Sequence, residues 1–125
     1  MQTVLLTGGA GYIGSHTCLV LLQNNFRVVV YDSFINSSKL ATERVQKIVE
    51  KDICDLDKKL FIWEGDIRDE KSLNNAFRYF YERKIPIRSV IHFAGLKAVA
   101  DSFLNPKEYW DVNVNGSKTL LKVMD

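Results

Sequence analysis

Three evenly spaced glycines near the start of the chain, Gly8, Gly11 and Gly14, have the type and spacing to bind phosphate. They separate the apolar run Thr3–Thr7 from Ser15–Gln23, where apolar residues recur at helical spacing, so a strand-to-helix turn is predicted. Gly8 would allow the tight turn, Gly11 the approach of a pyrophosphate, and Gly14 close packing of helix on strand. Amides at the helix start and the helix dipole then favour a bound phosphate. The alternative is a plain turn, because turns collect glycine for geometric reasons.

An acidic residue further along makes a dinucleotide the preferred ligand. Asp32 ends the apolar run Phe26–Tyr31 and lies 21 residues after Gly11. A carboxylate about 20 residues beyond the glycines accepts the hydroxyls of an adenosine ribose. The same carboxylate repels a 2′-phosphate, and no arginine follows it directly, so NAD is favoured over NADP. Together with the glycines, Asp32 favours a cofactor site over a plain turn.

Apolar periodicity predicts the elements that would carry this site. Strands are predicted at Thr3–Thr7, Arg27–Tyr31, Leu60–Glu64 and Ser89–Phe93. Helices are predicted over Gly14–Asn24, around Val45, Ile48 and Val49, around Leu73, Ala76, Phe77 and Phe80, and over Lys107–Met124 after a loop with Lys97, Asp101 and Pro106. Strands alternating with helices predict an α/β fold, a Rossmann-type doubly wound parallel sheet of strand order 3-2-1-4. Residues 1–125 are expected to form one NAD-binding domain, truncated before its later strands.

Residues that follow the third and fourth strands are expected at the ligand crevice, where parallel strands deliver them. Asp66 is expected to accept from an adenine amino group, with capping of the next helix as the alternative. Ala94 and Gly95 are small enough for the backbone to approach the ribose and nicotinamide half of the cofactor. His92 lies within an apolar strand and is interpreted as a hydrogen-bonded core residue, not a catalytic one. His16, on the first helix, is interpreted in the same way.

The overall composition is that of an ordinary globular domain, with 125 residues, 46% hydrophobic and 26% charged. A formal net charge of +2 argues against nucleic acid or an anionic membrane as a partner. Cys18 and Cys54 have no metal-binding or C-x-x-C spacing, so both are expected to stay reduced, and no metal site is predicted. The first strand leaves no room for a signal peptide, and no long apolar run occurs, so a cytoplasmic location is expected.

Three blocks of sequence together resemble one known family. They are Thr7–Thr17 (TGGAGYIGSHT), Glu64–Arg68 (EGDIR) and His92–Val99 (HFAGLKAV). The chain is similar over essentially its whole length to the UDP-glucose 4-epimerases, which are extended short-chain dehydrogenases/reductases. The block at His92–Val99 is the most specific of the three, since many dehydrogenases share the glycine motif.

The resemblance implies a set of NAD contacts. They are Gly8, Gly11, Tyr12, Ile13 and Gly14 at the pyrophosphate, Asp32, Ser33, Asn36 and Ser37 around the adenosine ribose, Asp66 and Ile67 at the adenine, and Phe93, Ala94, Gly95 and Lys97 along the other half. Asn113 matches the family's structural asparagine and is expected to bond the backbone of the preceding strand. Many epimerases have two adjacent asparagines where this chain has Val112–Asn113, so no cofactor contact is assigned to position 112.

The reaction implied by the resemblance belongs to galactose metabolism. It interconverts UDP-galactose and UDP-glucose through a 4-keto intermediate with tightly bound NAD. In the family a Tyr-x-x-x-Lys pair handles the proton, and this chain contains no such pair. The nearest match, Tyr79 with Arg83, is interpreted as a surface feature. No catalytic residue is therefore assigned, and the isolated chain is expected to be inactive.

The rest of such an enzyme is expected to follow Asp125, including the Tyr/Lys segment and a sugar-binding lobe. The intact enzyme is expected to bind a UDP-hexose and to form a homodimer. Two alternatives remain open: a stand-alone NAD-binding module, and another NAD-dependent nucleotide-sugar dehydratase or reductase.

Overall fold

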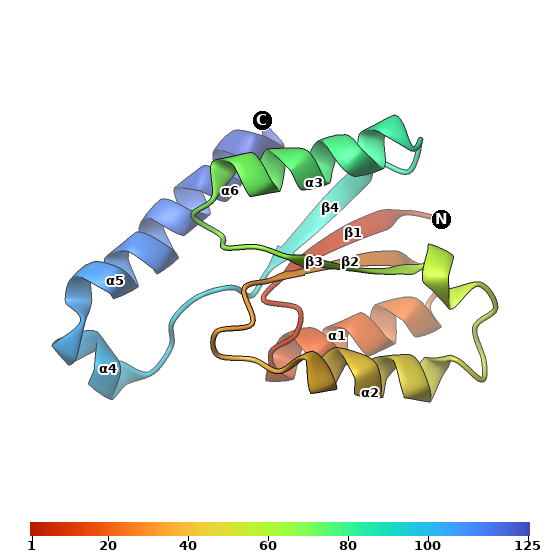
Figure 1. Cartoon of the computed structure of the whole chain (residues 1–125), viewed down its shortest axis with the longest axis horizontal. Helices are drawn as coiled ribbons and strands as arrows, with labels where there is room; N and C mark the ends of the chain where they lie inside the picture. The colour runs from red at the N-terminus through yellow and green to blue at the C-terminus, as the bar shows by residue number, and fades with distance from the viewer.

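The computed structural model describes residues 1–125 as a four-stranded sheet with helices on both faces (Figure 1). The strands are β1 (Thr3–Thr7), β2 (Arg27–Asp32), β3 (Leu60–Glu64) and β4 (Ile87–His92). They lie in the order β3-β2-β1-β4, and every neighbouring pair is parallel. The predicted topology is therefore confirmed. The predicted bounds of β1 and β3 are also confirmed, whereas β4 begins two residues earlier than predicted and ends one residue earlier.

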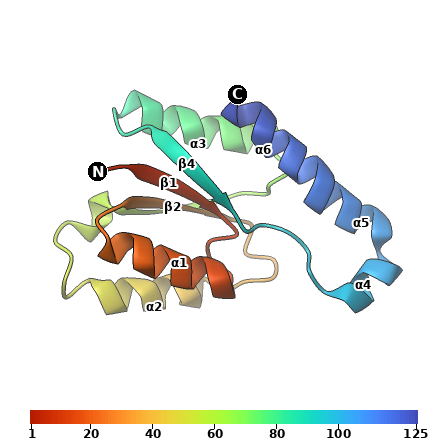
Figure 2. The ribbon, with the colours of Figure 1, turned by 180° about the vertical axis from the view of Figure 1, so that it is seen from behind.

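Two helices cover each face of the sheet. On one face lie α1 (Tyr12–Gln23) and α2 (Lys39–Val49), and on the other lie α3 (Glu70–Glu82) and α6 (Gly116–Met124) (Figures 1 and 2). A short 3-10 helix, η1 (Leu56–Lys58), precedes β3. Right-handed crossovers keep α1 and α2 on the same face while the chain moves from β1 to β2 and then to β3. The chain then returns past β1 to form β4, so the next helix, α3, lies on the opposite face.

The core has two halves because side chains on a strand alternate between the two faces of the sheet. Val4 and Leu6 of β1 belong to the cluster beneath α1 and α2. Leu5, between them, belongs to the cluster beneath α3 and α6, with Phe80 and Leu120. The two central strands, β1 and β2, are covered on both faces, so they appear in the sequence as nearly unbroken apolar runs.

The apolar residues that predict α2 are not all buried. Val45 and Val49 are buried, but Ile48 is 53% exposed. The face that packs on the sheet is narrow, since its buried residues are Thr42, Val45 and Val49, and Ile48 lies beside that face. The helix starts at a side-chain cap, because the hydroxyl of Ser38 accepts a hydrogen bond from the Leu40 amide at 3.1 Å.

The segment after β4 contains more helix than predicted. Residues predicted as a loop include the helix α4 (Val99–Leu104), and the predicted last helix consists of α5 (Pro106–Trp110), a π-helix η2 (Asp111–Asn115) and α6. In η2 the Gly116 amide bonds the Asp111 carbonyl, the i to i+5 pattern of a π-helix. Helices α4 and α5 extend away from the sheet (Figure 2) and contain no buried residue. Because neither helix packs on the sheet, their sequences show no apolar periodicity.

Two further findings concern the chain as a whole. Cys18 is buried and Cys54 is exposed, and neither forms a disulfide bond. Burial raises the pKa of the Cys18 thiol to about 12. No helix of the structure has both the length and the apolar composition needed to cross a lipid bilayer.

Candidate functional site

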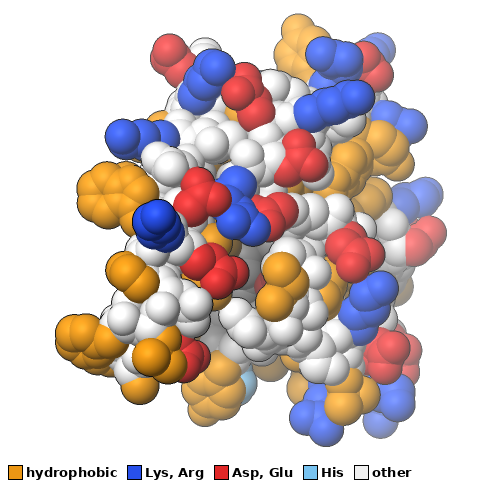
Figure 3. Space-filling view, turned by 60° about the vertical axis from the view of Figure 1, so that its left-hand side comes forward, with side chains coloured by type: hydrophobic (Ala, Val, Ile, Leu, Met, Phe, Trp, Pro, Cys, Tyr) orange, Lys and Arg blue, Asp and Glu red, His pale blue; other side chains and the backbone are white.

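A cavity of about 640 Å³ opens at the carboxyl ends of the strands. Figure 3 shows the molecule from this side, with a hollow among side chains of both charges. The predicted cofactor residues that line the cavity are Gly8, Gly11, Tyr12, Ile13, Gly14, Asp32, Ser33, Asn36, Ser37, Asp66, Ile67, Phe93, Ala94, Gly95 and Lys97. Asn113 is the one predicted residue outside the lining. The fold thus brings together residues from four separate connections of the chain.

The glycine turn has the geometry that the sequence predicted. Gly8 has a φ of +68°, a conformation that side chains disfavour, and a Cβ there would lie 2.7 Å from the Ala94 amide nitrogen. A Cβ on Gly14 would collide with the carbonyl oxygen of Gly8 and would lie 2.7 Å from the Gly9 Cα. Gly8 therefore permits the turn and the close approach of the segment after β4, and Gly14 permits α1 to begin directly against the turn.

The start of α1 offers unpaired donors to the cavity. The N-cap residue Gly11 has no side chain to cap the helix. The backbone amides of Tyr12, Ile13 and Gly14 find no acceptor within the protein, as expected in the first turn of a helix. A Cβ on Gly11 would have only the Gly8 carbonyl oxygen nearby, at 3.3 Å. Because the space beside Gly11 is open and the neighbouring amides are free, the turn fits a pyrophosphate.

Asp32 connects the glycine turn to the loop after β2. Its Oδ2 accepts from the Ala10 amide at 3.1 Å, and its Oδ1 accepts from the Phe34 amide at 2.8 Å and the Ser37 hydroxyl at 2.9 Å. Asp32 forms no ion pair with a basic side chain. The carboxylate is therefore oriented by three donors, and it retains lone pairs for the hydroxyls of a ribose.

Asp66 does not cap the following helix, so that alternative is wrong. The cap of α3 is Asp69, whose Oδ1 accepts from the Ser72 amide at 3.1 Å. Asp66 instead binds Arg68 through both carboxylate oxygens, at 3.0 and 2.7 Å. The hydrogen bond from the Arg68 side chain holds the pKa of Asp66 below its ordinary value. If Asp66 also accepts a hydrogen bond from an adenine amino group, its carboxylate does so while still bound to Arg68.

Arg68 was missed by the sequence analysis, and it also reaches the π-helix. Its Nη1 donates to Asp111 Oδ2 at 3.0 Å, 43 residues further along the chain. Asn115 donates to the other oxygen of Asp111, at 3.0 Å, and these bonds, from Asn115 first and then Arg68, lower the pKa of Asp111. Arg68 thus joins the β3–α3 connection to η2. No sequence signal short of the fold itself pairs these two segments.

Asn113 holds the segment between β4 and α4 in place. Its Oδ1 accepts from the Leu96 amide at 2.7 Å, and its Nδ2 donates to the Leu96 carbonyl at 2.9 Å. The predicted bond to the backbone is thus confirmed, although its partner lies just after the strand and not within it. In the same segment, Lys97 Nζ donates to the Phe93 carbonyl at 3.0 Å.

Both histidines make hydrogen bonds, but neither is a core residue. His92 bonds Thr7 and Ser117 and keeps an exposed surface, because β4 is an edge strand. His16 Nδ1 donates to the Tyr12 carbonyl at 2.7 Å, and the two rings lie 4.7 Å apart at their centroids. The hydrogen-bonded part of the interpretation is confirmed, and the core part is wrong.

Some residues that line the cavity were not among the predicted contacts. They include Arg68, Leu96, Asp101, Glu108 and Tyr109. The last three come from α4 and α5, two helices for which the sequence predicts no place at the crevice. Tyr109 donates its hydroxyl to the Ala98 carbonyl at 2.8 Å, which ties α5 back to the start of α4. Val112 also lines the cavity.

The pair Tyr79 and Arg83 lies on α3, away from the cavity. The guanidinium carbon of Arg83 sits 3.4 Å from the centroid of the Tyr79 ring, and its Nη1 donates to the Tyr79 carbonyl at 3.1 Å. The surface interpretation is confirmed for Arg83, which is exposed, whereas Tyr79 is half-buried against Trp63 and Phe80.

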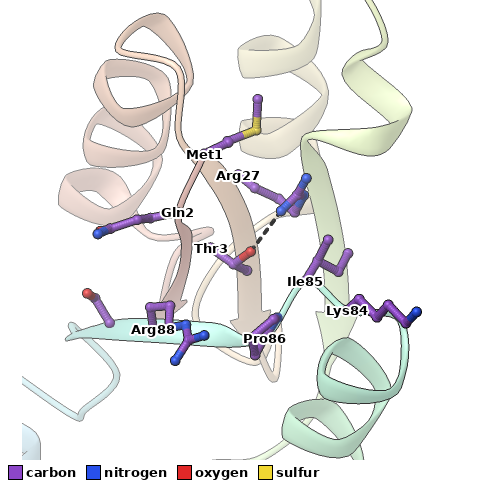
Figure 4. A pocket seen from close by; sticks show the side chains of 9 residues that line it. Met1, Gln2, Thr3, Arg27, Lys84, Ile85, Pro86 and Arg88 are labelled. Carbon is purple, nitrogen blue, oxygen red and sulfur yellow. Dashed lines mark hydrogen bonds between the residues drawn. The ribbon is translucent and has the colours of Figure 1, made fainter.

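A second cavity of about 350 Å³ lies at the amino ends of the strands, opposite the first cavity (Figure 4). Arg27 spans its wall, donating to the Thr3 hydroxyl at 3.1 Å and to the Lys58 carbonyl at 3.1 Å. Lys84 follows the carboxyl end of α3, where a cation is favoured by the helix dipole. Arg27 therefore has structural partners, and none of the predicted site residues lines this cavity.

A family model described as GDP-mannose 4,6 dehydratase matches residues 5–125. The chain is 46% identical over 124 residues to UDP-glucose 4-epimerase 1 of Oryza sativa subsp. japonica, covering 99% of this chain and 32% of that protein. It is 41% identical over 124 residues to the UDP-glucose 4-epimerase of Bacillus subtilis, covering 99% of this chain and 33% of that protein. The chain therefore spans about a third of the length of these relatives.

Solved structures show the same similarity. The UDP-glucose 4-epimerase of Bifidobacterium longum, in complex with NAD⁺ and UDP, matches with a TM-score of 0.83 and 44% identity, over 98% of this chain and 33% of that one. The UDP-glucose-4-epimerase of Stenotrophomonas maltophila, with bound NAD and formylated UDP-arabinopyranose, matches with a TM-score of 0.85 and 37% identity, over 99% and 33%.

Proposed function

The chain belongs to the family described as GDP-mannose 4,6 dehydratase, and within it we propose that the chain forms the NAD-binding part of a UDP-glucose 4-epimerase. The observation that carries the proposal is the single cavity in which the glycine turn, Asp32 and the segment Phe93–Lys97 meet. Relatives named as UDP-glucose 4-epimerases at 41% to 46% identity support the choice of reaction.

Each wall of the cavity has a role in this proposal. The free amides of Tyr12, Ile13 and Gly14 bind the pyrophosphate, and Asp32 accepts the hydroxyls of the adenosine ribose. Asp66 and Ile67 meet the adenine, while Phe93–Lys97 line the nicotinamide half. Bound NAD would supply a hydride acceptor and donor for the hexose C4. What these residues contribute is binding, orientation and a preference for NAD over NADP.

The chemistry on the sugar is assigned to other parts of the whole protein. The 125 residues contain no Tyr-x-x-x-Lys pair to move the proton of a 4-hydroxyl. In this proposal residues 1–125 are one partial NAD-binding domain, and the whole enzyme, an isomerase, binds the UDP-hexose and forms a homodimer. The chain alone then gives no UDP-glucose from UDP-galactose, even with NAD⁺ bound. Turnover by the purified chain would contradict this division of roles.

A dehydratase is the second candidate, because the matching family model is described as GDP-mannose 4,6 dehydratase. Both functions need a nicotinamide cofactor and pass through a 4-keto sugar, and they differ in what happens to that sugar next. Incubation of the whole protein with UDP-galactose distinguishes them: an epimerase gives UDP-glucose, whereas a 4,6-dehydratase gives a 4-keto-6-deoxy sugar.

Calorimetric titration of the chain with NAD⁺ and NADP⁺ tests the cofactor assignment. We expect saturable NAD⁺ binding, weaker NADP⁺ binding, and a loss of about 10- to 100-fold in NAD⁺ affinity for Asp32→Ala, because bonds to a charged acceptor are lost. Asp52→Ala, which removes an exposed carboxylate just after α2, serves as the matched control and should bind normally. Absence of NAD⁺ binding by a chain that circular dichroism shows to be folded would overturn the assignment.

A further inference from the structure

A closed ring of hydrogen bonds surrounds the segment that leaves β4. His92 Nδ1 lies 2.5 Å from the Thr7 hydroxyl, and His92 Nε2 lies 3.1 Å from the Ser117 hydroxyl. Ser117 in turn donates to the Asn113 carbonyl at 2.6 Å. Asn113 holds Leu96 by both backbone groups, and the Ala94 amide donates to the Thr7 hydroxyl at 3.3 Å. The ring therefore ties β1, β4, η2 and α6 to one short loop.

The direction of each bond determines which nitrogen of His92 carries the proton. Ser117 has a single hydroxyl proton, and it goes to the Asn113 carbonyl, so the Ser117 oxygen must accept from His92 Nε2–H. Thr7 already accepts from the Ala94 amide, and its own proton goes to His92 Nδ1. Every member of the ring is satisfied when His92 is neutral with the proton on Nε2.

Protonation of His92 would disturb this ring. An Nδ1–H would have to donate to Thr7, leaving the Thr7 hydroxyl proton without an acceptor in a residue with no exposed surface. Partial burial of the imidazole lowers the pKa of His92, and the nearby charge of Lys97 lowers it further. Lys97 lies in the loop itself, and the side chains that contact the imidazole from β1 and α6, Thr7 and Ser117, carry no charge.

We propose that His92, as its neutral Nε2–H tautomer, is a positioning residue that sets the loop Phe93–Lys97 for the nicotinamide half of the cofactor. The inference rests on the proposed function for its ligand. His92 does not line the cavity, so it acts through Thr7, which holds Ala94, and through Ser117, which holds the η2 turn that carries Asn113. Affinity for NAD⁺ then depends on the protonation state of a residue that does not touch NAD⁺.

A matched pair of serine and threonine variants tests the path through α6. Ser117→Ala and Thr119→Ala each remove a hydroxyl that donates to the carbonyl four residues earlier, at 2.6 and 2.9 Å. Only Ser117 also contacts His92. We expect Ser117→Ala to weaken NAD⁺ binding about 3- to 10-fold, the effect of losing the hydrogen bond to His92 that Thr119 does not make, while Thr119→Ala leaves it unchanged. Equal effects of the two variants would overturn the proposal.

The protonation state is tested by variants of His92 and by pH. His92→Phe should weaken NAD⁺ binding about tenfold or more, since it removes two hydrogen bonds. His92→Gln keeps a donor for Ser117 but no titratable group, so it should recover part of this loss. The affinity of the unmodified chain should fall as the pH is lowered below the usual histidine range of about 6.5, and that of His92→Gln should not. A pH profile shared by both proteins would contradict the inference.

Two readouts do not require NAD⁺. The imidazole ¹⁵N chemical shifts should show a protonated Nε2 and an unprotonated Nδ1 at neutral pH. The Ala94 and Leu96 amides should exchange faster in Ser117→Ala than in Thr119→Ala. An Nδ1–H tautomer, or unchanged exchange, would overturn the positioning role even if NAD⁺ binds. Conversely, if NAD⁺ does not bind but both readouts agree with the ring, the failure lies in the proposed function.

Discussion

Asn113 holds Leu96 by both of its main-chain groups, accepting from its amide at 2.7 Å and donating to its carbonyl at 2.9 Å. The two residues are 17 positions apart, one in the π-helix and the other in a loop without regular structure. A Cβ on the neighbouring Gly95 would lie 3.0 Å from Asn113 Oδ1. The side-chain amide thus replaces the backbone partners that a strand or helix would have supplied to this loop.

Asn113→Ala should destabilise the chain by about 1 to 3 kcal/mol, because it leaves two half-buried backbone groups without partners. Asn115→Ala is the matched control. Asn115 makes one exposed side-chain bond, to Asp111 at 3.0 Å, so its loss should cost about 0.5 kcal/mol or less. Urea denaturation of the two variants gives both values. Equal losses would show that the Leu96 bonds contribute little to the folded state.

Gly8→Ala and Gly11→Ala should separate folding from cofactor binding. Alanine at position 8 would have to adopt a φ of +68° and would press on the Ala94 amide, so we expect a loss of at least about 1 to 2 kcal/mol in stability. Gly11 has a φ of −73° and open space around its Cβ position. Gly11→Ala should therefore fold normally but bind NAD⁺ at least about tenfold more weakly, since a methyl group would occupy the space of the pyrophosphate. Thermal melts and calorimetry distinguish the two effects.

Removal of the Arg68 side-chain charge should change how the folding stability depends on pH. Asp66 and Asp111 have lowered pKa values in the folded chain, so each contributes stability that is present above the ordinary aspartate pKa and is lost as the pH falls through the lowered one. Arg68→Met removes the cation that both share. The variant should be less stable near neutral pH, and the decline of its stability below about pH 4 should be shallower than in the unmodified chain. Denaturant titrations over this pH range measure both, and parallel profiles would contradict the prediction.

The free edge of β4 should make the isolated chain self-associate. β4 pairs only with β1, and its other side has no neighbour in the sheet, which leaves backbone groups open to pairing with another molecule. Ser89→Lys adds a charge on this exposed edge and should reduce association, whereas Asn75→Lys adds the same charge on the exposed side of α3 and should not. Light scattering over a range of concentrations tests this. A monodisperse monomer throughout would contradict it.

Features set by neighbouring residues were predicted well. The bounds of β1 and β3 and the turn at Gly8 and Gly14 follow from periodicity or from the steric demands of a single residue. The strand order also follows, because right-handed crossovers leave few choices. The helix α4 was missed because its apolar residues Val99, Phe103 and Leu104 are more than 70% exposed, so no buried face imposes a period on them.

By itself, then, the sequence determined the parallel sheet, the phosphate-binding turn, and the acidic residue at the end of β2, since each follows from a local residue pattern or from the handedness of strand–helix–strand connections. The tertiary structure alone decided which distant side chains meet around the site. Thr7 meets His92 across 85 residues, and Arg68 meets Asp111 across 43. Such pairs depend on the register of β1 against β4 and on where η2 packs. A hydrogen bond needs its two atoms about 3 Å apart, and only the folded chain brings these atoms that close.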